Sequence, residues 1–174
     1  MGSDMVRAPL NGMTPKAQRL STLCWLTCFE MLFTWKGLDP AEIIPELKAG
    51  GIDTDEAFKT GLKLNQNLKA AKALGMGATG LGQSVSAWDL KERLKMSPIW
   101  TCGKWTAANN THIVVVVGAS ESTVEYYDPW YDVGPWEVSD KKSRGFDWFV
   151  HGNGKDVKGT DYATGWYQLI YWKA

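Results

Sequence analysis

Three side chains with the chemistry of a nucleophilic enzyme lie far apart in this sequence. Cys24 stands in the first turn of a predicted helix, His112 opens an apolar run, and Asp128 follows 16 residues later. A thiolate is a nucleophile, and the pKa of a thiol falls at a helix N-terminus or beside an imidazolium. This order therefore favours nucleophilic catalysis, with His112 as general base and acid and Asp128 orienting its ring.

The remaining cysteines and the second histidine have simpler interpretations. Cys28 lies one helical turn after Cys24, and Cys102 lies in a predicted strand, so we expect both to be structural. His151 precedes a glycine-rich loop and is expected to be solvated. These residues show no paired zinc-ligand spacing, so neither a metal nor a cofactor is predicted.

The orienting carboxylate has one alternative interpretation and one substitute. Asp128 precedes a proline, and an aspartate in that position also forms turns. Asp132 is the nearby residue that could replace it.

The elements that must position these groups divide into a helical first half and a strand-rich second half. Helical periodicity and capping residues predict helices over Cys24–Lys36, Asp39 to about Leu47, Asp55–Leu74 and Trp88–Leu94, with a glycine-rich loop over 75–83. Short apolar runs predict strands over Ile99–Gly103, His112–Gly118, Thr123–Tyr127, Trp136–Val138, Phe146–Val150 and Trp166–Trp172. Because helices and strands do not alternate, the α+β class with an antiparallel sheet fits best.

Length, charge and cysteine content narrow the class of protein. The 174 residues suffice for one domain spanning 1–174, with residues 1–17 expected as a flexible N-terminal segment. Lysine plus arginine and aspartate plus glutamate each number 19, so neither nucleic acid nor a membrane is predicted as a partner. Three cysteines and no long apolar run predict a soluble protein working in a reducing, cytoplasmic compartment.

Four features of the chain resemble papain-like cysteine peptidases, particularly their small bacterial, C39-like variants. Gln18 stands six residues before Cys24, and Trp25 follows the cysteine directly, as in the Cys-Trp signature at the head of the family's central helix. His112 begins a valine-rich strand. The next predicted strand ends in Asp128, Pro129 and a tryptophan, similar to the family's Asn or Asp followed two residues later by tryptophan.

The resemblance implies a papain-like fold, in which a long central helix packs on a C-terminal antiparallel sheet. It also implies that the Gln18 side chain joins the Cys24 backbone N–H in an oxyanion hole, and that Trp130 can shield the bond between histidine and Asp128. Cys24 and His112 lie closer in sequence than the ~130–150 residues typical of papain and cathepsins, which implies a trimmed version of that fold.

We expect a cysteine peptidase that cleaves a protein substrate, and small domains of this kind also occur as bacterial toxins and effectors. In that setting, a secretion system would deliver the protein to a target cell, and the producing cell would need a cognate immunity or inhibitor protein. The same thiol chemistry also supports side-chain deamidation or acyl transfer. The ten tryptophans leave a non-catalytic binding module as a further alternative.

Overall fold

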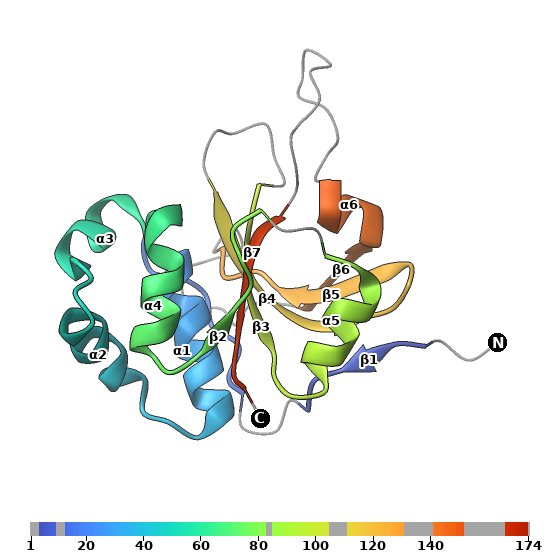
Figure 1. Cartoon of the computed structure of the whole chain (residues 1–174), viewed down its shortest axis with the longest axis horizontal. Coiled ribbons are helices and arrows are strands. Elements are labelled where there is room, and N and C mark those ends of the chain that lie inside the picture. Colours follow the sequence, from blue (N-terminus) through green and yellow to red (C-terminus); the bar gives the residue numbers. More distant parts are fainter. Residues whose placement is uncertain are drawn as a thin grey trace, which may run out of the picture.

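A computed structural model of the chain describes residues 4–9, 13–82, 85–104, 111–130, 141–151 and 166–173 (Figure 1). The helices are α1 (Cys24–Lys36), α2 (Ile43–Ala49), α3 (Thr54–Thr60), α4 (Asn67–Ala73), α5 (Ala87–Leu94) and α6 (Phe146–His151). Two short 3-10 helices are η1 (Pro40–Glu42) and η2 (Leu64–Gln66). The strands are β1 (Val6–Arg7), β2 (Gly77–Ala78), β3 (Ile99–Gly103), β4 (His112–Ala119), β5 (Thr123–Tyr127), β6 (Lys141–Gly145) and β7 (Trp166–Tyr171).

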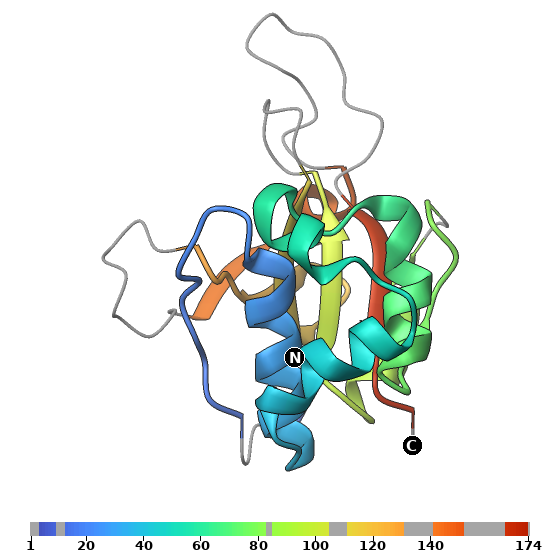
Figure 2. The ribbon, with the colours of Figure 1, turned by 90° about the vertical axis from the view of Figure 1, so that its left-hand side faces the viewer.

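The strands form one antiparallel sheet with helices on both faces. The strand order is β2-β7-β3-β4-β5-β6, and β1 pairs with the end of β4. Helices α1 to α4 lie against one face, and α5 and α6 lie against the other (Figures 1 and 2). This arrangement confirms the predicted α+β class, with a helical first half packed on the later strands.

Each face of the sheet has its own hydrophobic core. On the α1 face, the Phe29 ring stacks on Trp100 with centroids 4.9 Å apart. On the opposite face, Leu90 of α5 and Phe149 of α6 are buried against the strands. The four valines at 114–117 alternate between the two cores, as expected for a strand covered on both sides.

Helix α1 has the bounds that the sequence predicts. It ends at Gly37, whose φ of 80° is a conformation that glycine adopts without steric cost. Two tryptophans of the sheet donate to its backbone: Trp100 Nε1 to Trp25 O at 3.0 Å, and Trp172 Nε1 to Leu32 O at 3.0 Å. No helix in the described part of the chain is long and apolar enough to cross a membrane.

The predicted continuous helix over Asp55–Leu74 is wrong. The chain forms α3, breaks at Gly61, and resumes through η2 into α4. Gly61 has φ 87° and ψ 163°, a combination that only glycine adopts readily, so it ends α3. Phe58 before this break and Leu68 after it are exposed.

The predicted strand Phe146–Val150 is also wrong, because these residues form α6. Short apolar runs do not distinguish a strand from a buried helical turn, and here Phe149 reaches the core from a helix. The predicted strands over β3 and β5 have the observed bounds, and those over β4 and β7 differ by one residue at the C-terminal end. The predicted strand Trp136–Val138 lies outside the described residues.

Three strands of the sheet, β1, β2 and β6, have no matching prediction. The residues of β6, KKSRG, are polar and mostly exposed, as suits an edge strand. The two-residue β2 lies within the predicted glycine loop and pairs with β7.

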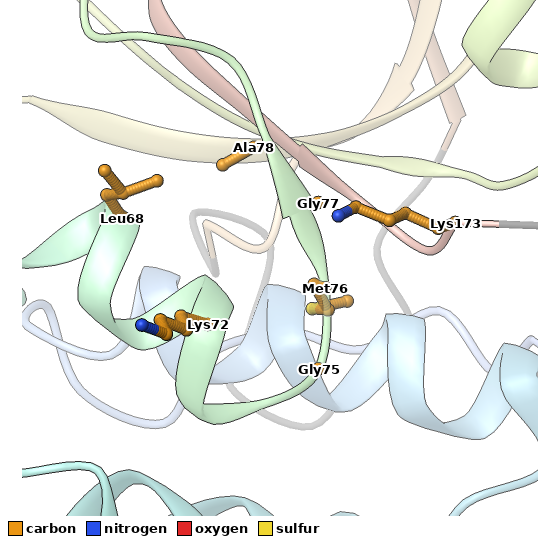
Figure 3. A pocket seen from close by; sticks show the side chains of 7 residues that line it. All are labelled: Leu68, Lys72, Gly75, Met76, Gly77, Ala78 and Lys173. Carbon is orange, nitrogen blue, oxygen red and sulfur yellow. The ribbon is translucent and has the colours of Figure 1, made fainter.

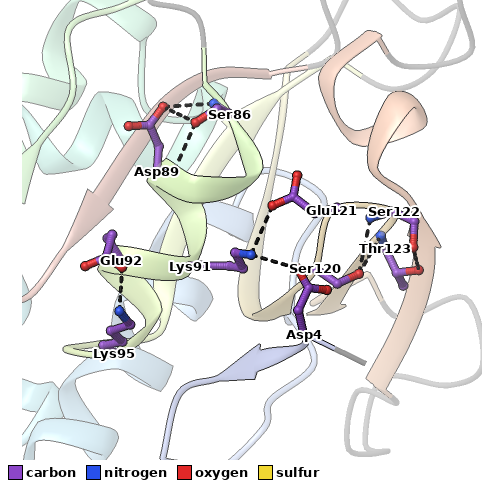
Figure 4. Close-up of polar contacts among 10 residues, drawn as sticks. All are labelled: Asp4, Ser86, Asp89, Lys91, Glu92, Lys95, Ser120, Glu121, Ser122 and Thr123. Atoms are coloured by element: carbon purple, nitrogen blue, oxygen red, sulfur yellow. Dashed lines mark hydrogen bonds and ion pairs between the residues drawn. The ribbon is translucent and has the colours of Figure 1, made fainter. Parts of the chain in front are cut away.

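Helix α5 begins with the predicted serine cap and connects to the N-terminal residues (Figure 4). Ser86 Oγ accepts from the Asp89 N–H at 3.1 Å, while the Asp89 carboxylate accepts from the Ser86 N–H at 2.9 Å. One turn later, Lys91 Nζ lies 2.8 Å from Asp4 and 3.0 Å from Glu121. The helix therefore holds the chain before β1 and the turn before β5 together.

Residues near the N-terminus contact the sheet. Val6 and Arg7 pair with Ala119 and Gly118 of β4, and Arg7 Nε lies 2.6 Å from Glu125 Oε1. Residues 1–3 and 10–12 lie outside the described part of the chain.

Candidate active site

Cys24 is the first residue of α1, where the helix leaves its backbone N–H groups without helical acceptors. The preceding residue, Leu23, provides no side-chain cap, and the first turn carries no acidic residue. Positive potential from the helix therefore acts on the buried Cys24 side chain without a competing carboxylate of the same turn.

His112 and Asp128 come from the ends of neighbouring strands, β4 and β5, and contact each other. His112 Nε2 lies 2.7 Å from Asp128 Oδ1, and their side chains are 27% and 18% exposed. The same carboxylate oxygen accepts from the Trp130 N–H at 3.0 Å. This second hydrogen bond fixes the carboxylate in the turn that follows β5.

The other partner of the imidazole is the Cys24 side chain. Because Nε2 faces Asp128, the second ring nitrogen, Nδ1, is left for the hydrogen bond with Cys24. Burial alone lowers the pKa of His112, but the hydrogen bonds with Asp128 and Cys24 outweigh it and raise this pKa to about 9. Burial raises the pKa of Asp128, yet the bonds from His112 and Trp130 and the charge of Lys142 bring it below its ordinary value.

Gln18 lies on the chain that enters α1. Its side chain is buried, and its Nε2 donates to Leu20 O at 2.7 Å. Its backbone N–H donates to Pro129 O at 2.7 Å, which joins the chain before the cysteine to the turn after Asp128. The structure therefore brings Gln18 to the same region as Cys24, with one amide hydrogen directed at Leu20.

The two predicted supporting tryptophans have different surroundings. Trp25 is fully buried and meets Phe58 edge-on, with ring centroids 6.0 Å apart. Trp130 is exposed, and its ring lies edge-on to His112 at 6.3 Å. Trp130 therefore lies beside the imidazole.

The other two cysteines are buried and differ from Cys24 in their surroundings. Cys28 Sγ donates to Ile113 O at 3.5 Å, and burial raises the pKa of this thiol well above its ordinary value. Burial likewise raises the pKa of Cys102 to about 12. Neither thiol has a histidine partner among the described contacts, in agreement with the structural roles expected for them.

The side chains of two residues considered in the sequence analysis are not described by the structure. Asp132 lies outside the described residues, and the side chain of His151, in α6, is not described.

Sequence reasoning missed one charged neighbour of these groups, Lys142. Its Nζ lies 3.7 Å from Asp128 Oδ2. The residue belongs to β6, whose polar sequence gives no strand signal, so nothing placed it beside Asp128 in advance.

A concave surface with a volume of about 420 Å³ lies between α4 and β2, away from these residues (Figure 3). Leu68, Met76 and Ala78 line it together with Lys72 and Lys173. Its lining includes no cysteine, histidine or carboxylate, so it offers none of the groups of a cysteine protease site.

Comparison with known proteins agrees with this geometry. A search of curated proteins finds no match. The family model described as "Papain-like cysteine protease AvrRpt2" matches residues 10–153, a span that includes Gln18, Cys24, His112 and Asp128. The match covers most of the chain, and the α+β fold is consistent with a papain-like protein. The chain therefore belongs to the family of the papain-like cysteine protease AvrRpt2 and is a cysteine protease.

Proposed function

We propose that Cys24, His112 and Asp128 are the catalytic triad of this protease and that its substrate is a protein cleaved through a thioester intermediate. The observation that carries the proposal is the chain of hydrogen bonds from Cys24 to His112 to Asp128 at the N-terminus of α1. Membership of a cysteine protease family favours hydrolysis over deamidation or acyl transfer, and no feature of the geometry favours a non-catalytic binding module.

In this mechanism, Cys24 transfers its proton to His112 Nδ1, and the thiolate attacks the carbonyl carbon of the scissile peptide bond. The imidazolium then donates that proton to the leaving amine as the carbon–nitrogen bond breaks, which leaves a thioester on Cys24. A water molecule gives a proton to His112 and attacks the thioester, and the acid product leaves as the thiol forms again. Asp128 holds the ring with Nδ1 facing the sulfur throughout.

The negative charge that develops on the carbonyl oxygen needs donors near Cys24. The Cys24 backbone N–H lies in the first turn of α1, and the second amide hydrogen of Gln18 is not used by Leu20. We propose that these two groups form the oxyanion hole, although Gln18 is buried and a carbonyl reaches it only when neighbouring side chains move. Loss of one such donor costs ~2.7–4 kcal/mol of transition-state stabilisation in comparable sites.

Alkylation by iodoacetamide near neutral pH tests the triad without a known substrate. Cys24 should react much faster than Cys28 and Cys102, because Cys24 is the one thiol with a histidine partner among the described residues and the other two thiols have raised pKa values. Mass spectrometry of peptides identifies the labelled cysteine.

The matched control uses the only other histidine. His112→Ala should remove the preference for Cys24, whereas His151→Ala should retain it. Loss of general base catalysis should also slow the hydrolysis of a protein substrate ~10²–10⁴-fold in His112→Ala. Equal labelling of all three cysteines in the native protein would disprove the proposed nucleophile.

We further propose that the protein is a bacterial effector, formed by one papain-like domain over 1–174, that works in a reducing compartment of a target cell. The family match and the three free cysteines support this setting. A producing cell that is sensitive to the protease would need a cognate inhibitor. Expression in candidate target cells should be harmful for the native protein and harmless for Cys24→Ala; equal effects of the two would exclude a role that depends on catalysis.

A further inference from the structure

The two oxygens of the Asp128 carboxylate have different partners. Oδ1 receives the His112 Nε2 contact and the Trp130 N–H. Oδ2 faces Lys142 Nζ at 3.7 Å, which is longer than an ordinary hydrogen bond. The lysine therefore acts on the carboxylate mainly through its charge.

The fold places Lys142 at this position through strand pairing. In the β5–β6 pair, Lys142 is opposite Tyr126 and Lys141 is opposite Tyr127. Side chains of a strand alternate between the two faces of the sheet, so the two lysines contact different carboxylates. Lys141 Nζ lies 3.4 Å from Glu125 Oε2, whereas Lys142 reaches Asp128 beyond the end of β5.

We propose that Lys142 is a positioning residue of the protease: its ammonium lies against Oδ2 of Asp128 and, through its charge, weakens the bond between Asp128 and the imidazolium of His112. The inference rests on the proposed role of Asp128 and goes beyond it, because it gives the triad a fourth participant on an edge strand.

The charged and titratable groups near Asp128 come from several elements. Helix α1 contributes Cys24, which bonds to His112, and Cys28, whose thiol interacts with the carboxylate. Tyr126 of β5 also interacts with Asp128. Among these described groups, Lys142 is the one cation besides His112 that acts on the carboxylate.

The direction of the effect follows from the placement of the charges. The carboxylate lies between two cations, so each reduces the stabilisation that the other receives. Removing the lysine charge should strengthen the bond between Asp128 and the imidazolium and raise the pKa of His112. Because Lys142 is 40% exposed, solvent screening limits the shift to roughly 0.2–0.7 pH units.

The test measures the rate of Cys24 alkylation against pH in Lys142→Met, together with the titration of His112 by NMR. Lys141→Met is the matched control, since it removes a neighbouring lysine of the same strand that is 41% exposed and pairs with Glu125. Lys142→Arg keeps the charge and should restore the native profile. Of these variants, we expect only Lys142→Met to move the high-pH transition of the alkylation rate to higher pH.

A purely structural role would not produce this pattern. Suppose that Cys24 still reacts in a His112-dependent manner. An unchanged profile in Lys142→Met, or an equal shift in Lys141→Met, would then overturn the inference. If native Cys24 lacks that dependence, the proposed triad itself fails, and the inference fails with it.

Discussion

Replacing Asp128 with asparagine tests the electrostatic role of the carboxylate while preserving its shape. An asparagine oxygen can still accept from His112 Nε2 and from the Trp130 N–H, so the turn after β5 should persist. Only the negative charge is lost. A hydrogen bond to a charged group contributes ~1.5–3 kcal/mol, against ~0.5–1.5 kcal/mol for a neutral one.

The difference of about 1–1.5 kcal/mol corresponds to about one pKa unit. The pKa of His112 should therefore fall from about 9 in the native protein to roughly 8 in Asp128→Asn. NMR titration measures this directly, because the chain has two histidines and a His151→Gln variant assigns the second signal. Titration of His112 near its usual value of 6.5 in both proteins would refute the reasoning.

The charges of His112 and Asp128 also predict the pH range in which their bond stabilises the folded protein. Because the pKa of His112 is raised, the contribution of this residue to the free energy of unfolding is fully present below pH 6.5 and is lost as the pH rises through about 9. Because the pKa of Asp128 is lowered, the contribution of this residue to the free energy of unfolding is present above pH 3.8 and is lost as the pH falls below that value. The native protein should exceed Asp128→Asn in free energy of unfolding most between about pH 4 and 6.5.

Two further predictions concern α5 and α3, which pack on opposite faces of the sheet, and urea unfolding measures both. Ser86→Ala removes the acceptor for the Asp89 N–H and should lower the free energy of unfolding by ~0.5–2 kcal/mol; no loss would mean that the capping box of α5 is dispensable. Gly61→Ala forces a side chain into a backbone conformation at φ 87° and ψ 163° and should cost ~1–3 kcal/mol. A stable Gly61→Ala protein would show that the chain after α3 can adopt another course.

Sequence reasoning succeeded where periodicity and termination signals agree. Helix α1 has both an apolar pattern and Gly37, and β4 has a run of valines that only a doubly covered strand accommodates. It failed where the local pattern has two solutions. Phe146–Val150 fits a strand or a helical turn, and contact with the core decides between them.

The residues of the candidate site could be chosen from the sequence by type and order, whereas their charged neighbours could not. Cys24, His112 and Asp128 were chosen by type and order, and the structure places them in contact. The neighbour Lys142 depends on the register between β5 and β6, which is a property of paired strands and not of either sequence alone. The bond from Gln18 Nε2 to Leu20 O was likewise not predictable, because it is set by the turn before α1.

The hydrogen bond from the Gln18 N–H to Pro129 O has a consequence for mutational tolerance. It joins the chain before Cys24 to the turn after Asp128 through main-chain atoms, which most side-chain substitutions leave in place. Of the substitutions at position 18, proline is the one that removes the donor outright. Side chains around the candidate site can therefore be replaced while this main-chain bond keeps the helix that carries Cys24 aligned with the turn that carries Asp128.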